Sequence, residues 1–161
     1  MTNSHSVVLS ELLSPRSINL DLQSADRDSV LSELVNQIPQ LAKQPAARQT
    51  LLRALQEREQ LHSTGIGDGI ALPHARNALV GLVDGALMVF GRHARGIPFD
   101  AIDGVPSRLF FLLLAPTVTQ HLAILARLSR ILRDPTLRQD LLAAASAEQV
   151  IALIREAEAK M

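Results

Sequence analysis

The sequence contains no cysteine, no tryptophan and no tyrosine, and it has only four phenylalanines among 161 residues. Without cysteine the chain has no thiol nucleophile, no zinc–thiolate site and no disulfide bond. A site that stacks sugars or single-stranded nucleic acid on aromatic rings would have very little material. Any chemistry must therefore come from other side chains.

An excess of charge of one sign is also missing, because 16 Lys and Arg residues balance 16 Asp and Glu residues. Nucleic-acid binding through phosphate neutralisation needs a basic chain or a basic stripe, so we expect no nucleic-acid partner. The longest apolar run, 109–116, has about eight residues, whereas a membrane-spanning helix needs roughly 20. We therefore expect no membrane insertion.

The N-terminal segment has neither a basic region nor a long apolar stretch. We expect no signal peptide and a cytoplasmic location. Hydrophobic residues make up 47% and charged residues 20% of the chain, which is typical of a globular protein. A chain of this length corresponds to a single domain.

The spacing of apolar residues predicts both helices and strands. Alternation at 18–22 predicts a short strand, and apolar runs at 85–90 and 108–114 predict two more, the latter buried on both faces. Helical spacing predicts helices over 27–43, 46–60, 120–133, 136–144 and 147–159. Expected helix starts are Ser24 or Asp26, Pro45, and Ser146 with Gln149 as a capping box. This order predicts an α/β fold, a mixed β-sheet covered by helices on both faces.

A glycine-rich segment follows the second predicted helix, with Gly65, Gly67 and Gly69 at alternate positions. It is not the dinucleotide motif G-x-G-x-x-G, because the third glycine comes one residue early and a helix precedes it. A phosphate-binding loop ending in Gly-Lys-Ser or Gly-Lys-Thr is absent. Two interpretations remain open: a tight connection that needs positive φ, or a backbone nest for an anion.

One of the five histidines stands out by its setting. His74 follows Pro73, which removes a backbone donor and favours an extended preceding residue. This places the imidazole just after a buried strand, where open α/β folds position reactive groups. The ordinary interpretation of a lone histidine is structural or solvated, and it applies first to the others: His5, His62, His93 and His121.

Two further residues are weaker candidates. His121 lies at the start of a predicted helix, with Thr119 as the expected N-cap, and the field of a helix N-terminus attracts phosphate. Arg58 lies in a run of charged residues whose ordinary interpretation is a solvated helix face. Spacing supports no Ser–His–Asp triad, and a two-histidine metal site through His74 and His121 stays open on spacing alone.

The segment 63–75, with the sequence Ser-Thr-Gly-Ile-Gly-Asp-Gly-Ile-Ala-Leu-Pro-His-Ala, resembles the active-site segment of a known family. The family is the fructose/mannitol-type enzyme IIA of the bacterial phosphoenolpyruvate-dependent phosphotransferase system. The stretches 98–106 and 109–116 resemble its nitrogen-regulatory branch. The resemblance implies one type-2 enzyme IIA domain over 8–158, with flexible ends at 1–7 and 159–161.

The resemblance also implies a chemistry. Members of the family are phosphotransferases in which a histidine accepts a phosphoryl group from an HPr-like phosphocarrier, and His74 falls on that position. His121 and Arg58 fall on a second histidine and an arginine at the site. No metal, nucleotide or other cofactor is implied. The expected hydrogen-bond donors to the phosphoryl oxygens are Ser63, Thr64, Gly65, Gly67 and Gly69.

Three functions remain open on the sequence. The first is a regulatory phosphocarrier that binds target proteins, such as ion-transport or sensor-kinase components, in one phosphorylation state. The second is a sugar-specific enzyme IIA that passes phosphate to a cysteine of an enzyme IIB. The third is a binding module without catalysis. The lack of any cysteine, and hence of a fused IIB domain, favours the regulatory carrier.

Overall fold

Five strands form one mixed sheet in the order β1-β4-β5-β3-β2 in the computed structural model, which describes residues 8–75 and 82–161. β1 runs parallel to β4, and β3 runs parallel to β5, whereas β4 with β5 and β2 with β3 are antiparallel. The strands are β1 (Ile18–Asn19), β2 (Gly65–Gly67), β3 (Ile70–Ala71), β4 (Leu87–Ile97) and β5 (Ser107–Leu114). The predicted mixed sheet is thus confirmed.

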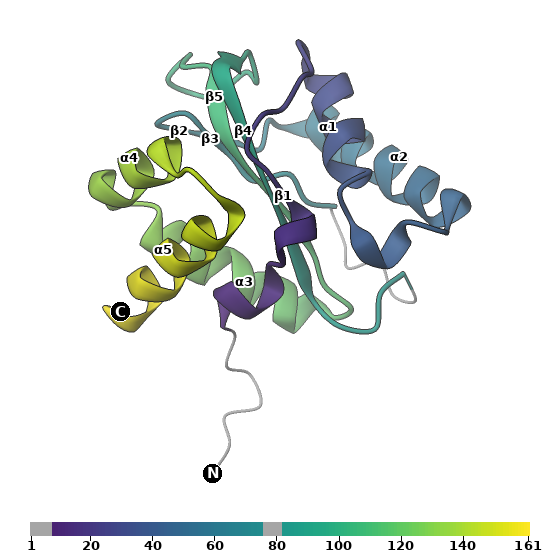
Figure 1. Ribbon diagram of the computed structural model, residues 1–161. Coiled ribbons are helices and arrows are strands. Elements are labelled where there is room, and N and C mark those ends of the chain that lie inside the picture. Colours follow the sequence, from purple (N-terminus) through teal and green to yellow (C-terminus); the bar gives the residue numbers. More distant parts are fainter. Residues whose placement is uncertain (1–7, 76–81) are drawn as a thin grey trace.

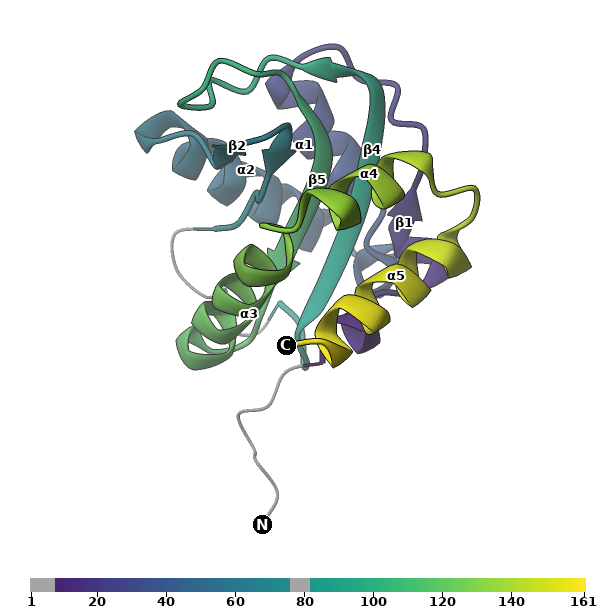
Figure 2. The ribbon, with the colours of Figure 1, turned by 90° about the vertical axis from the view of Figure 1, so that its left-hand side faces the viewer.

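Helices cover both faces of this sheet. One face carries α1 (Arg27–Val35) and α2 (Pro45–Leu61), and the other carries α3 (Val118–Ile131), α4 (Pro135–Ala143) and α5 (Ala147–Ala159) (Figures 1 and 2). Three short 3₁₀ helices are η1 (Leu9–Leu12), η2 (Pro15–Ser17) and η3 (Pro39–Leu41). No helix in the two described ranges is long and apolar enough to cross a bilayer.

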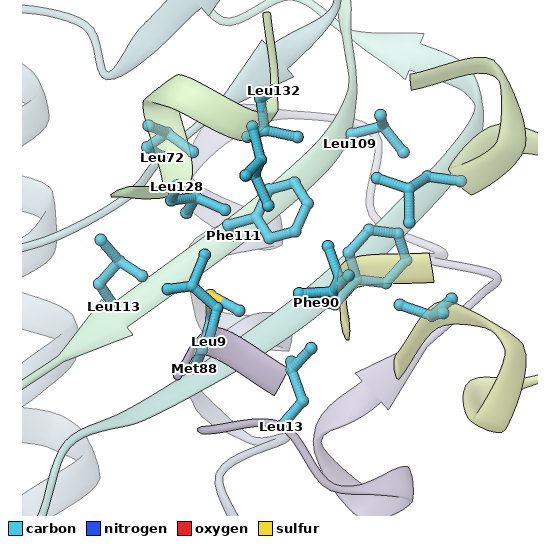
Figure 3. Packing of buried hydrophobic residues seen from close by; sticks show 14 of the residues in the cluster. Leu9, Leu13, Leu72, Met88, Phe90, Leu109, Phe111, Leu113, Leu128 and Leu132 are labelled. Carbon is cyan, nitrogen blue, oxygen red and sulfur yellow. The ribbon is translucent and has the colours of Figure 1, made fainter. Parts of the chain in front are cut away.

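The core consists of two apolar layers, one on each side of the two long central strands. Side chains of β5 alternate between them, so Phe111 belongs to the layer under α3, α4 and α5 and Phe110 to the layer under α1 and α2. Phe111 meets Phe90 of β4 edge to face, with ring centroids 5.1 Å apart (Figure 3). A strand with apolar residues on both faces is typical of a sheet covered twice, as the run at 108–114 predicted.

Several local predictions are confirmed. Asp26 caps α1 by accepting a hydrogen bond from the backbone N–H of Ser29. Pro45 is the first residue of α2. Ser146 caps α5, where its hydroxyl accepts from the Gln149 N–H at 3.1 Å, although the Gln149 side chain bonds the Ala145 N–H rather than that of Ser146.

Other predictions are wrong at their boundaries. The helix expected over 27–43 ends at Val35, because Pro39 disfavours helical geometry at Ile38, which is extended (φ −80°, ψ 108°). Ile38 and Leu41 lie beyond this break but are still buried. Apolar residues therefore continue in the sequence at helical spacing although the helix has ended. The expected cap Thr119 is inside α3, and Thr117 is the actual N-cap.

Candidate functional site

Two histidines from distant parts of the sequence meet at one edge of the sheet. β3 leads through Leu72 and Pro73 to His74, and β5 leads through a short loop to α3, which carries His121 in its first turn. Because β3 and β5 are parallel neighbours, their carboxyl ends lie at the same edge. A hydrogen bond of 3.1 Å from the Leu113 N–H to the Pro73 carbonyl continues the pairing beyond β3.

The two imidazole rings are in contact, with centroids 5.1 Å apart and planes tilted by 50°. His74 is half-buried, and His121 is 8% exposed. Nδ1 of His74 lies 2.7 Å from the carbonyl oxygen of Leu72. A carbonyl only accepts, so this contact assigns the ring proton to Nδ1 and leaves the lone pair on Nε2.

Arg58 reaches the same place from the last turn of α2. It lines, together with His74, a cavity of about 320 Å³. Its Nη1 donates to the carbonyl oxygen of His62 at 2.5 Å, so the guanidinium also closes the C-terminal end of α2. The remaining lining residues are Ser63, Thr64, Ile66, Leu72, Leu125, Ala126 and Ser129. The three residues expected at the site are therefore brought together.

The surroundings favour uncharged imidazoles. Burial lowers the pKa of His74 below its usual value of 6.5; the charge of Arg58 acts in the same direction and the hydrogen bond to Leu72 in the opposite one. Burial, and then the neighbouring His74, lower the pKa of His121. At neutral pH both rings are therefore uncharged, and His74, which lines the cavity, carries its lone pair on Nε2.

The glycine-rich segment is a β-hairpin, in which β2 and β3 pair across a tight turn at Asp68 and Gly69. Both turn residues have positive φ, 57° and 77°, as a type I′ turn requires, and Gly67 also has positive φ at 95°. The interpretation of a tight connection that needs positive φ is confirmed. The Asp103 carboxylate accepts from the Asp68 N–H at 2.9 Å and so fastens the turn to the loop between β4 and β5.

Both hydroxyls expected to bind phosphate are engaged within the protein. The Ser63 hydroxyl donates to the Phe99 carbonyl and accepts from the Gly65 N–H at 2.9 Å. The Thr64 hydroxyl donates to the carboxylate of Glu59. Phosphate binding by this segment stays a prediction, and it carries a condition: each hydroxyl would have to release its present acceptor before donating to a phosphoryl oxygen.

Sequence reasoning did not single out Glu59, although this residue is only 4% exposed. The signal that could have found it is periodicity. Leu51, Leu55 and Glu59 follow one another at intervals of four residues and form the buried stripe of α2. Glu59 is thus the last member of the buried stripe of α2, and its carboxylate lies at the end of the stripe that is nearest to the site.

The other histidines that the structure describes, His62 and His93, do not join the site. Nε2 of His93 lies 2.8 Å from the Ser24 carbonyl, and its Nδ1 accepts from the Gly96 N–H at 2.9 Å, so both nitrogens hold backbone. His62 is exposed at the end of α2, and His5 lies outside the described residues. Across 8–75 and 82–161, no three His, Asp or Glu side chains are grouped to hold a metal ion.

Comparison with known proteins agrees with this geometry. Residues 11–157 match the family described as "Phosphoenolpyruvate-dependent sugar phosphotransferase system, EIIA 2". A nitrogen regulatory protein of Bradyrhizobium diazoefficiens is 32% identical over 91% of this chain and 94% of its own length. The PTS system fructose-specific EIIABC component of Bacillus subtilis is 35% identical over 92% of this chain, which spans 23% of that longer protein.

A solved structure supports the same assignment. The nitrogen regulatory protein IIA-Ntr of Neisseria meningitidis superposes with a TM-score of 0.81 at 31% identity, over 92% of this chain and 99% of that one. The chain therefore belongs to the EIIA 2 family of the phosphoenolpyruvate-dependent phosphotransferase system, whose members are phosphotransferases that relay a phosphoryl group.

Proposed function

We propose that this phosphocarrier accepts its phosphoryl group on Nε2 of His74, from an HPr-like carrier, within a single enzyme IIA domain over 8–158. The observation that carries the proposal is the hydrogen bond between Nδ1 and the Leu72 carbonyl. It leaves Nε2 as the nucleophilic nitrogen of an uncharged ring beside the cavity that Arg58 also lines.

The transfer itself exchanges one phosphorus–nitrogen bond for another. The Nε2 lone pair attacks the phosphorus atom, the bond to the donor's phosphohistidine breaks, and the donor nitrogen keeps that electron pair. The Nδ1 proton stays in place, donated to Leu72. Because charge spreads over three equatorial oxygens, positioning and electrostatics dominate the barrier. The Arg58 guanidinium offers a forked donor to these oxygens, and an N–H of His121 offers another.

The direct test is intact-mass measurement after incubation with phosphoenolpyruvate, enzyme I and an HPr-like carrier. We expect one acid-labile phosphoryl group per chain. Nitrogen-15 spectra of the phosphorylated protein should place the group on Nε2 of His74. A phosphoryl group on Nδ1, or none with several carriers tried, would refute the proposal.

Replacing Arg58 or His121 with alanine should slow the transfer without abolishing it. Loss of one preorganised donor to developing charge costs on the order of 100-fold in rate. Arg58→Lys should recover only part of the loss, because an ammonium lacks the planar fork. Rapid-quench measurement gives the rates, and Arg53→Ala, on the exposed face of α2, is the matched control. Unchanged rates in both alanine variants would remove these roles.

The acceptance rate should depend on pH through His74. Its pKa is lowered, so the uncharged nucleophile dominates at pH 7, and the rate should fall only as pH drops below 6.5 through the lowered pKa. Arg58→Ala should move this acid limb to higher pH, since the charge of Arg58 lowers the pKa. Titration of the His74 ring by NMR distinguishes the fall in rate caused by protonation of His74 from a fall caused by titration of the donor protein. A ring pKa above 6.5 would contradict the expectation.

The cavity is flanked by exposed apolar side chains suited to a protein partner. Ile66 of β2 lines it and is 50% exposed, and Leu122, the residue after His121 in α3, is 58% exposed. Phosphorylation adds roughly two negative charges at His74, enough to repel or recruit a partner at this surface. We propose that regulatory targets, ion-transport or sensor-kinase components, bind one of the two states.

The regulatory role is favoured because a relative named nitrogen regulatory protein is matched over 94% of its own length, whereas the fructose-specific EIIABC component is matched over 23% of its length. A sugar-specific role predicts that phosphate moves on to a cysteine of an enzyme IIB. Incubating the phosphorylated protein with purified IIB domains tests this directly. Transfer to one of them at a rate matching the loading step would favour sugar uptake.

A further inference from the structure

The mechanism above makes no use of Glu59, although its carboxylate is buried next to the site. Its Oε1 accepts from the Thr64 N–H at 3.0 Å, and its Oε2 accepts from the Thr64 hydroxyl. Within the described residues it forms no salt bridge, and both hydrogen-bond donors belong to Thr64. Burying a carboxylate is costly, and burial raises the pKa of Glu59 even though the hydrogen bonds from Thr64 and the charges of Arg27 and Arg58 act in the opposite direction.

A continuous line of hydrogen bonds joins this carboxylate to the reacting ring. Glu59 holds both the N–H and the hydroxyl of Thr64. The Thr64 carbonyl in turn accepts from the Leu72 N–H at 2.9 Å. The Leu72 carbonyl receives the proton on Nδ1 of His74 at 2.7 Å. The last acceptor in this line is therefore the group that fixes the tautomer of His74.

The local backbone explains why such an anchor is needed. Pro73 has no N–H, so the Leu72–Pro73 peptide, which contains the Leu72 carbonyl, cannot donate a backbone hydrogen bond that would hold it in place. Regular pairing of β2 begins only at Gly65, one residue after Thr64. A carboxylate with two oxygens can hold Thr64 at two atoms at once, which fixes the direction of its carbonyl as well as its position.

We propose that Glu59 is a positioning residue for phosphoryl transfer: by clamping Thr64 it holds the Leu72 carbonyl against Nδ1 of His74 and keeps the lone pair on Nε2. This inference rests on His74 being the phosphoryl acceptor. It predicts that the hydrogen-bonding capacity at position 59 is required and that the negative charge is not.

Four substitutions test the proposal. Glu59→Met keeps the length of the side chain without an acceptor, and Thr64→Val removes the hydroxyl at constant shape. Each should lower the rate of phosphoryl acceptance at least tenfold. Glu59→Gln can accept from the Thr64 N–H and donate to its hydroxyl, and Thr64→Ser keeps a hydroxyl. These two conservative variants should stay within threefold of the unmodified protein.

A readout at the ring separates positioning from mere loss of stability. Nitrogen-15 NMR of the unphosphorylated protein should show His74 with its proton on Nδ1. In Glu59→Met and Thr64→Val the Nε2-protonated form should appear in exchange with it. Glu158→Gln is a destabilised control, since Glu158 is also buried but binds Leu9, Ser10 and Arg127. It should lower the melting temperature and leave the tautomer and rate unchanged.

Coupling between the two positions gives the final check. If Glu59 acts through Thr64, the double variant Glu59→Met with Thr64→Val should be no slower than the slower single variant. Multiplied losses, or an unchanged His74 tautomer in both single variants, would overturn the positioning role. If instead the unmodified protein accepts no phosphoryl group, or His74→Ala still accepts one, the acceptor assignment fails and not this inference alone.

Discussion

Replacing His74 with alanine should abolish phosphoryl acceptance, with an expected loss of roughly 1,000-fold or more, as for removal of a nucleophile in other covalent mechanisms. His62 and His93 do not offer an equivalent atom. His93 uses both ring nitrogens on backbone groups, and His62 is exposed outside the cavity lining. Intact-mass measurement over a time course of phosphorylation gives the loss.

His121 is the residue most able to mask this effect, because its ring touches that of His74. It is only 8% exposed, however, and a donor that brings the phosphorus to Nε2 of His74 does not thereby reach the neighbouring ring. His74→Ala and the double variant His74→Ala with His121→Ala should therefore show the same absence of phosphoryl acceptance. A phosphorylated His74→Ala protein would contradict the assignment.

The same variant should leave the fold intact. His74 lies after the end of β3 and is half-buried, and among the described residues its side chain hydrogen-bonds only to the Leu72 carbonyl. Its removal creates no cavity in either apolar layer of the sheet. The melting temperature should change by only a few degrees, which calorimetry measures directly. His62→Ala, an exposed histidine at the end of α2, is the control and should affect neither property.

Local signals in the sequence were sufficient for much of the fold. The apolar run at 108–114 predicted a doubly covered strand, and β5 is that strand. Ser146 and Asp26 predicted helix starts because their side chains satisfy N–H groups a few residues away. In each case the cause and its effect lie within a few residues, so a single sequence carries the information.

What could not be predicted depends on pairing between distant segments. The residues in and around Ile70–Ala71 and Ser107–Leu114 do not indicate that these two strands are parallel neighbours. That pairing nevertheless brings His74 to His121. The glycine-rich segment left two interpretations open because positive φ serves a hairpin turn and an anion nest alike. Glu59 was not singled out because burial of its carboxylate depends on Thr64, which lies beyond the end of α2.

Family resemblance supplied what local physics could not. On residues alone, Arg58 belonged to an ordinary charged helix face, and His121 was a polar residue in a first turn. The resemblance placed both at the site, and the structure brings Arg58 to the cavity and His121 to the ring of His74. It did not indicate Glu59, whose contribution is visible only in the hydrogen bonds that run from α2 to the histidine.

Phe111→Ala should produce the largest loss of stability. Phe111 is fully buried in the centre of β5, where it packs edge to face on Phe90 beneath the helices of one face (Figure 3). Truncating such a side chain removes its buried surface and leaves a cavity, at a cost of about 3–5 kcal/mol. For a domain of this size that corresponds to a fall in melting temperature of roughly 5–20 °C.

Denaturant unfolding measures this loss, and Ile102→Ala provides the matched control, because Ile102 is a large apolar residue that is completely exposed. The control should change the free energy of unfolding by less than about 0.5 kcal/mol. A loss below about 1 kcal/mol for Phe111→Ala would mean that the layer under α3, α4 and α5 closes around the missing ring. At temperatures where the variant is folded, β5 still pairs with the segment that leads to His74, so phosphoryl acceptance should persist. The two variants should therefore have opposite effects. Phe111→Ala lowers the free energy of unfolding and leaves phosphoryl acceptance intact, whereas His74→Ala removes phosphoryl acceptance and leaves stability nearly unchanged.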